Sequence, residues 1–296
     1  MINLIKYRSV FISQNKNQIG AFSSTDGWVI LSPIEARIKA KIEAVGTPLR
    51  DWDINIYRGI LTGYNEAFII DKQTRDRLID ASPKNAEIIR PILRGRDIKK
   101  YTANFANQYI INTHNGSKNG TKAINTKNDY PAIFEHLLQY ETALAKRQDK
   151  GQHWSNLRNC AYLEDLEKEK IIWIELTDHP NFTLDTTGIY LNNTIFFMTG
   201  LHLKYLLTYL NSRLCEWYFD KIAATSGVGT RRWIKIYIDQ ICAIKPNPII
   251  EEEMNILADK ALKNNSKETL KEIDLAFYKL FDLDSDQIDV VEKANL

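Results

Sequence analysis

The segment PILRGRDIKKY, residues 91–101, holds the side chains best suited to a chemical task. Its cations stand close together around a single acid and are Arg94, Arg96, Lys99 and Lys100. Lysine and arginine contact nucleic-acid phosphates, and arginine can also pair with the edge of a guanine base. Gly95 permits a tight turn or a close approach of another chain. The segment therefore indicates anion binding, although a solvated basic loop has the same composition.

Two further groups of cations either bind an anion or belong to an ordinary solvated surface. They are Arg231, Arg232 and Lys235, which follow a glycine-containing loop, and Lys146 and Arg147, which end a predicted helix. Basic residues beside an aromatic side chain suit a nucleic-acid surface. A surface loop and an ordinary helix C-terminus are the alternatives, because cations are favoured at the negative end of a helix dipole.

A polar loop precedes the basic segment. Thr62 and Asn65 lie on this loop, where Gly59 and Gly63 bracket the turn. Their side chains are candidates for hydrogen bonds to a bound nucleic acid. Plain turn chemistry explains them equally well, since Asn and Gly favour turns.

Recognisable catalytic patterns do not occur in the sequence. An Asn/Asp-Pro-Pro-aromatic tetrapeptide, which amino-methylating DNA enzymes use beside a flipped base, is absent. The glycine fingerprints of dinucleotide and nucleotide sites are absent too. The histidines show no metal-ligand spacing, and Asp97 with Lys99 forms only a chance fragment of a nuclease motif. We therefore assign no catalytic residue and no metal ligand.

The apolar pattern predicts the elements that would position these residues. Strands are expected at 28–31, 68–70, 109–111, 170–176, 190–191, 194–198 and 238–244. Helices are expected from a Ser32 cap to Gly46, from 131 to 147, and from 203 to 218. Two Lys- and Glu-rich helices follow Ile249. The expected fold class is α/β (α+β): a twisted mixed or mainly antiparallel sheet with several helices in residues 1–248, then a helical C-terminal tail, 249–296.

Composition limits the class of protein. The chain has 296 residues, 44% of them hydrophobic, and a net charge of +2, so a basic surface requires an uneven distribution of charge. Three widely spaced cysteines suggest no disulfide framework and fit a reducing, cytoplasmic setting. We see no signal peptide and no apolar run long enough to span a bilayer.

Several motifs in a fixed order resemble a known family. They are GILTGYNEAF from Gly59, PILRGRDIKKY from Pro91, KIIW from Lys170, LNSR from Leu210, GTRRWIKIY from Gly229 and EIDLAFYKLF from Glu272. This order resembles the TaqI-like C-terminal specificity region of adenine-specific DNA methyltransferases, which type IIG restriction-modification enzymes also carry. The resemblance runs from about Trp28 to the end of the chain.

The resemblance implies a domain that recognises a specific sequence in double-stranded DNA. It places the methyltransferase and nuclease parts, with their S-adenosylmethionine and Mg, outside this chain, either upstream or on a partner polypeptide. The DNA-contacting candidates are then Thr62, Asn65, Arg94, Arg96, Lys99, Lys100, Lys146, Arg147, Arg231, Arg232 and Lys235. The alternatives are a protein-interaction module, or a specificity subunit that docks a separate catalytic chain. Independent catalysis by this chain is not expected.

Overall fold

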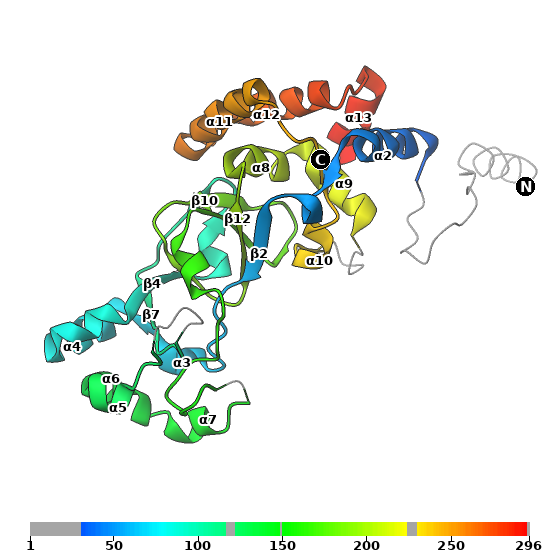
Figure 1. Cartoon of the computed structure of the whole chain (residues 1–296). Helices are drawn as coiled ribbons and strands as arrows, with labels where there is room; N and C mark the ends of the chain where they lie inside the picture. The colour runs from blue at the N-terminus through cyan, green and yellow to red at the C-terminus, as the bar shows by residue number, and fades with distance from the viewer. Residues whose placement is uncertain (1–30, 117–121, 149, 224–229, 295–296) are drawn as a thin grey trace, which may run out of the picture.

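The computed structural model describes residues 31–116, 122–148, 150–223 and 230–294 (Figure 1). The strand predicted at 28–31 lies almost wholly outside these residues, and so do residues 224–229 of the glycine-containing loop. Within the described residues, two four-stranded sheets and three short strand pairs combine with helices. The mixed α/β fold class is therefore confirmed.

The central sheet has the strand order β10-β8-β12-β2, and every neighbouring pair is antiparallel. Its strands are β2 (Ile54–Arg58), β8 (Lys170–Ile174), β10 (Phe182–Asp185) and β12 (Ile195–Gly200). Successive side chains on a strand point to opposite faces. Ile171 and Trp173 accordingly enter one hydrophobic core, while Ile172 enters another. The central sheet is thus covered on both faces.

The second sheet, in the order β11-β4-β7-β3, is mixed. Its strands are β3 (Ile69–Asp71), β4 (Ile89–Leu93), β7 (Gln108–Ile111) and β11 (Tyr190–Leu191). β11 runs parallel to β4, and the other two pairs are antiparallel. Around this sheet lie α3 (Asn65–Phe68), α4 (Lys72–Ala81), η2 (Pro83–Glu87), α5 (Thr126–Asp129), α6 (Pro131–Leu138), α7 (Glu141–Ala145) and η4 (Leu163–Glu167).

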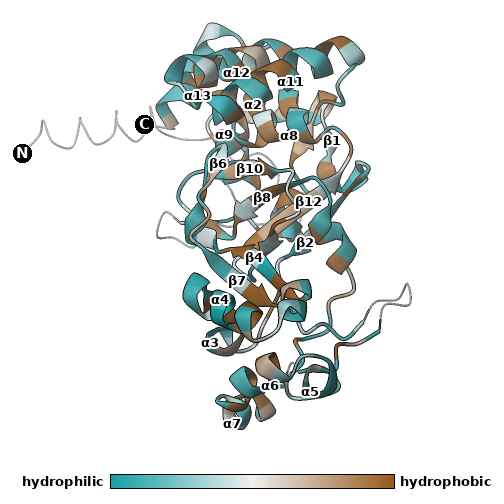
Figure 2. Cartoon of the chain, turned by 90° about the vertical axis from the view of Figure 1, so that its left-hand side faces the viewer, coloured by the Kyte–Doolittle hydropathy of each residue, from teal (hydrophilic) through white to brown (hydrophobic). Residues whose placement is uncertain are grey.

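Most of the other helices gather at the opposite end of the molecule. They are α2 (Pro33–Val45), α8 (Leu203–Leu210), α9 (Arg213–Ile222), α11 (Pro248–Lys263), α12 (Lys267–Leu280) and α13 (Ser285–Ala294). Figure 2 shows hydrophobic residues gathered on the strands between the two groups of helices. The C-terminal helices contribute Phe277 and Val291 to the same core as Trp173.

The remaining elements are short connections. They are β1 (Thr47–Pro48) paired with β14 (Cys242–Ala243), β5 (Ile98–Lys99) with β6 (Thr102–Ala103), β9 (Leu176–Thr177) with β13 (Arg231–Arg232), and η1 (Leu49–Asp51), η3 (Gly95–Asp97) and α10 (Lys235–Ile238). The prediction of a strand at 238–244 is wrong for its first part, where the structure has the end of helix α10 and a turn.

Some helices begin where they were predicted, whereas other predicted helices are divided into shorter ones. Ser32 caps α2 and forms a capping box with Glu35, as the Ser-Pro start predicts. The helix predicted over 131–147 is divided into α6 and α7 by a turn at Gln139 and Tyr140. The helix predicted over 203–218 is likewise two helices. Asn211 leaves the helix to bond the backbone of Phe182 on β10, and Ser212 caps α9. Within the described residues, the C-terminal tail holds three helices where two were predicted.

The described residues hold no candidate for a membrane-spanning helix or a metal site. None of their helices has the length and the apolar character needed to cross a membrane. Among these residues, no group of three or more His, Cys, Asp or Glu side chains is arranged to hold a metal ion.

Candidate nucleic-acid interface

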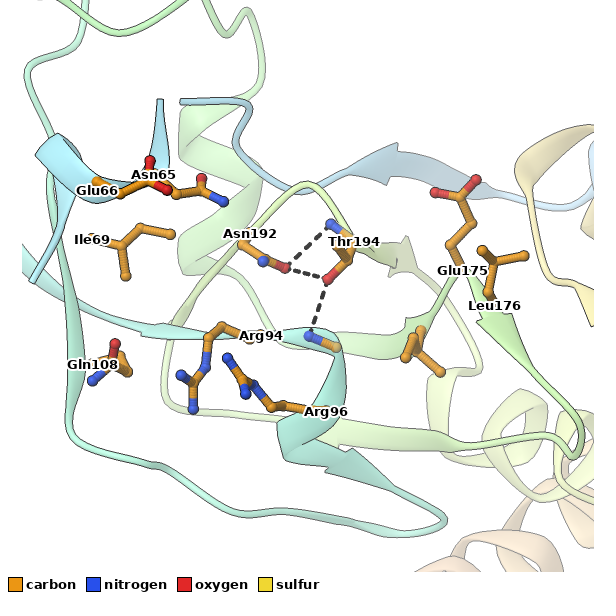
Figure 3. Close-up of a pocket in the computed structure, with 12 residues that line it drawn as sticks. Asn65, Glu66, Ile69, Arg94, Arg96, Gln108, Glu175, Leu176, Asn192 and Thr194 are labelled. Carbon is orange, nitrogen blue, oxygen red and sulfur yellow. Dashed lines mark hydrogen bonds between the residues drawn. The ribbon is translucent and has the colours of Figure 1, made fainter. Parts of the chain in front are cut away.

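A pocket of about 570 Å³ lies where the two four-stranded sheets meet (Figure 3). Its lining brings together side chains from α3, β3, β7, η3 and the segments that follow β8 and β11. The lining residues are Asn65, Glu66, Ile69, Arg94, Gly95, Arg96, Gln108, Ile174, Glu175, Leu176, Asn192 and Thr194. Three of the predicted site residues, Asn65, Arg94 and Arg96, therefore share one concave surface.

Arg94 is held in place by its own turn. The 3-10 helix η3 begins directly after it, and the Asp97 carboxylate accepts a hydrogen bond from the Arg94 backbone N–H at 2.8 Å. The same carboxylate accepts from Arg94 Nε at 3.1 Å and from Nη2 at 3.0 Å. Asp97 itself is buried. The arginine fork is therefore fixed before any ligand arrives.

A hydrogen-bond relay fastens this turn to the central sheet. The Gly95 N–H donates to Thr194 Oγ1 at 3.1 Å, and that hydroxyl donates to Asn192 Oδ1 at 2.6 Å (Figure 3). The Thr194 N–H donates to the same oxygen at 3.2 Å. A β-carbon at Gly95 would approach Ile174 and Thr194 to 2.9 Å, so the close fit requires glycine.

Neighbouring cations of the basic segment take different directions. Arg96 and Lys99 are exposed, and neither pairs with any residue in the described part of the chain. Lys100 instead lies half-buried beside Asp274 of α12 and Glu216 of α9. Burial lowers the pKa of Lys100, and these two carboxylates act against that shift. Lys100 is therefore placed toward the helical end of the molecule and away from the pocket.

The polar loop before α3 contributes one exposed and one buried side chain. Asn65 is exposed at the start of α3, while Thr62 is almost fully buried. The Thr62 hydroxyl donates to Asn65 Oδ1 at 2.6 Å. Thr62 thereby orients the Asn65 amide, whose NH₂ group makes no hydrogen bond with the described residues.

At the pocket edge, one glutamate links two arginines from strands that are distant in sequence. Glu175, which follows β8, pairs with Arg58 of β2 and with Arg232 of β13, the latter at 3.3 Å. The Arg58 and Arg232 side chains are about half exposed. The Glu175 carboxylate therefore holds two accessible cations on either side of itself. Arg232 was among the predicted residues, whereas Arg58 was not.

Arg147 lies inside the protein. Its guanidinium donates to the carbonyl oxygens of Leu144, Thr62, Trp154 and Asn156, and its carbon lies 4.9 Å above the centre of the Phe68 ring. Burial lowers its pKa below the ordinary arginine value. This placement gives the side chain a structural task, because four backbone acceptors depend on it.

The other three predicted cations lie apart from the pocket lining. Arg231 is largely buried and pairs with Asp220 at 2.6 Å and with Glu216 at 2.9 Å. The hydrogen bond to Asp220 raises the pKa of Arg231. Lys235 is exposed and pairs with Asp239 one turn along α10, and Lys146 is exposed at the end of α7.

Sequence reasoning missed much of the pocket wall. Glu66, Gln108, Glu175, Asn192 and Thr194 all line it. Glu66 follows the predicted Asn65, so the same loop pattern could have included it. The other residues lie in or directly beside strands that the sequence predicts, yet only the pairing of those strands brings them to one place.

Comparisons with known proteins place these features in context. A family model described as a TaqI-like C-terminal specificity domain matches residues 90–242. The type IIL restriction-modification enzyme MmeI, solved in complex with DNA, superimposes with a TM-score of 0.61 at 9% identity, covering 83% of this chain and 36% of that chain. The type IIG restriction endonuclease BpuSI gives 0.55 at 13% identity, covering 88% of this chain and 31% of that chain. A search of curated protein sequences gave no match. The chain spans about a third of the length of either enzyme, and the likeness shows a shared fold.

Proposed function

The chain belongs to the family of TaqI-like C-terminal specificity domains, and from this premise we propose that it recognises a specific sequence in double-stranded DNA for a restriction-modification system. The predicted DNA-contacting role and the family assignment point in the same direction. The fold shared with a DNA-bound restriction-modification enzyme supports the proposal.

The observation that carries this proposal is the composition of the pocket between the sheets. Arg94, Asn65 and Gln108 present an arginine fork and two side-chain amides to one concavity. Arginine pairs with guanine edges, and asparagine and glutamine pair with adenine edges, so these are the residue types that read DNA bases directly. Glu66 adds an acceptor, which suits the amino group of a cytosine.

Cations around this pocket supply the expected phosphate contacts. Arg96 lies in the pocket wall, while Arg58 and Arg232 flank Glu175 at its edge. Contacts to phosphate fix the register of a protein on the duplex without reading its sequence. Lys99, Lys146 and Lys235 are exposed and remain candidates for the same role.

We propose a type IIG-like system with an adenine-N6 methyltransferase, whose S-adenosylmethionine and Mg sites lie in parts of the same or a partner polypeptide outside this chain. The chain spans about a third of MmeI and BpuSI, which leaves room in such enzymes for those parts. A cytoplasmic setting belongs to the same proposal.

Selection from a randomised duplex pool across a salt series tests DNA recognition. We expect a short motif to be enriched, with affinity that falls as salt rises, because phosphate contacts release counterions. Binding without enrichment would place the sequence-reading ability elsewhere. No binding even at low salt would contradict the proposal and favour a protein-interaction module that docks a catalytic chain.

The Arg96→Ala variant measures the phosphate contribution. We expect weaker binding to all duplexes alike, and a slope of log affinity against log salt that is reduced by about 1. Arg37→Ala is the matched control, since Arg37 is exposed on α2 at the helical end of the molecule. Equal affinities and slopes for the two variants would remove Arg96 from the interface.

A further inference from the structure

Arg94 and Arg96 differ sharply in freedom, although one residue separates them. Arg94 gives its Nε and Nη2 hydrogens to the Asp97 carboxylate at 3.1 and 3.0 Å. That carboxylate is buried and anchored by the Arg94 backbone N–H. Arg96 is exposed and pairs with no residue in the described ranges. Figure 3 shows both guanidinium groups on the same side of the pocket.

The contact with Asp97 determines which edge of Arg94 stays available. A guanidinium has five N–H donors in a planar fork. The carboxylate occupies the side edge formed by Nε and Nη2. The end edge, with one outward N–H from Nη1 and one from Nη2, makes no hydrogen bond with the described residues. Arg94 therefore offers two parallel donors in a fixed direction.

Two parallel donors distinguish one base from the other three. In the major groove, guanine presents two neighbouring acceptors, O6 and N7, whereas adenine presents an acceptor beside a donor. A fork that is already immobilised also loses little conformational freedom on binding. The free Arg96 lacks such an anchor and suits a phosphate, which accepts contacts from many directions.

Resting on the proposed function, we propose that Arg94 reads a guanine in the major groove of the target site and that Asp97 is its positioning residue. Arg96 then contributes to affinity without choosing a base. The same end edge could instead clamp a backbone phosphate. That alternative predicts an equal loss of affinity for every DNA sequence, whereas a guanine contact predicts a loss of discrimination at one position.

The decisive comparison is selection from a randomised duplex pool with the wild-type chain, Arg94→Lys and Arg96→Lys. Both substitutions retain the positive charge, but lysine lacks the fork. We expect Arg94→Lys to lose about 5- to 150-fold of discrimination for guanine at one position while other positions stay enriched. Arg96→Lys should leave the enriched motif unchanged. An unchanged motif with Arg94→Lys, or a uniform loss of affinity with it, would overturn the inference.

A second measurement leaves the protein unaltered and so does not depend on how the variant folds. Each guanine of the selected site is replaced in turn by 7-deazaguanine, which removes the N7 acceptor. One replacement should weaken wild-type binding about 5-fold or more and should have no further effect on Arg94→Lys. Additive losses at every guanine would overturn the inference. Failure of the wild-type chain to enrich any motif would instead contradict the proposed DNA recognition itself, and the inference with it.

Discussion

Arginine has opposite tasks at two positions of this chain. Arg147 directs its guanidinium into the protein, where four backbone carbonyls accept its hydrogens. Arg96 directs the same group into an open pocket. The sequence shows a cation at both places, and only the surrounding acceptors separate a structural arginine from one that is available to a ligand.

The buried position leads to a prediction about stability. Arg147→Ala should lower the free energy of unfolding by about 2–4 kcal/mol, because the carbonyl groups it serves would stay buried without a donor. Urea unfolding followed by circular dichroism measures the change. The adjacent and exposed Lys146 provides the control, and Lys146→Ala should alter stability by less than about 0.5 kcal/mol. Equal effects of the two substitutions would contradict a structural role for Arg147.

At the scale of elements, the basic segment is positioned by its attachment to β12. Thr194 precedes that strand and links the Gly95 N–H to Asn192. The geometry of Arg94 and Arg96 therefore depends on a residue that lies about a hundred positions further along the chain.

Thr194→Val tests this dependence. The substitution keeps the shape of the side chain but removes the acceptor of Gly95 N–H and the donor to Asn192. We expect a weaker enrichment of the target motif, with a loss of about 1 kcal/mol in specific binding and little change in binding to unrelated duplexes. Retention of the full enrichment would show that the turn keeps its geometry without the relay. Thr187→Val, which removes a hydroxyl bonded to Asp185, is the control.

Some elements could be predicted because their signals are local. The apolar, β-branched run from Lys170 predicts a strand, and the structure has β8 there. The Ser32-Pro33 start predicts a helix, and the structure has α2 there. The division between α8 and α9 could not be predicted, because it depends on hydrogen bonds from the Asn211 side chain to the backbone of Phe182 on β10. Tertiary hydrogen bonds of this kind leave no mark on the periodicity.

The candidate site shows the same limit. Residue types predicted Arg94, Arg96 and Asn65, which do meet in one pocket. Strand pairing alone brings Gln108 and Glu175 to them, so composition could not predict those two. Lys100 and Lys99 are neighbours in sequence, yet one faces the helices and the other solvent.

At the scale of the whole molecule, the central sheet belongs to two hydrophobic cores. Ile171 and Trp173 enter the core that holds Phe277 of α12, while Ile172 enters the core that holds Leu137 of α6. Since β8 supplies both sides, loss of either core removes support from the same strands. The two ends of the molecule should therefore unfold together.

Two core substitutions examine this cooperativity. Phe277→Ala and Leu137→Ala should each lower the free energy of unfolding by about 2–5 kcal/mol, because each leaves a cavity in a packed core. Tryptophan fluorescence and far-ultraviolet circular dichroism should report one shared transition for each variant. Leu275→Ala is the control on α12, since Leu275 is about half exposed. Separate transitions in either variant would show that the two cores unfold independently.

The contact between α2 and α13 has a further consequence for protein engineering. These helices are the first and last that the structure describes, and they pack into one core at the end of the molecule remote from α4–α7. The first and last described helices therefore lie at a single pole of the molecule. A unit joined to another protein beside α2 and α13 could be exchanged as a cassette, because both junctions would then fall in one region.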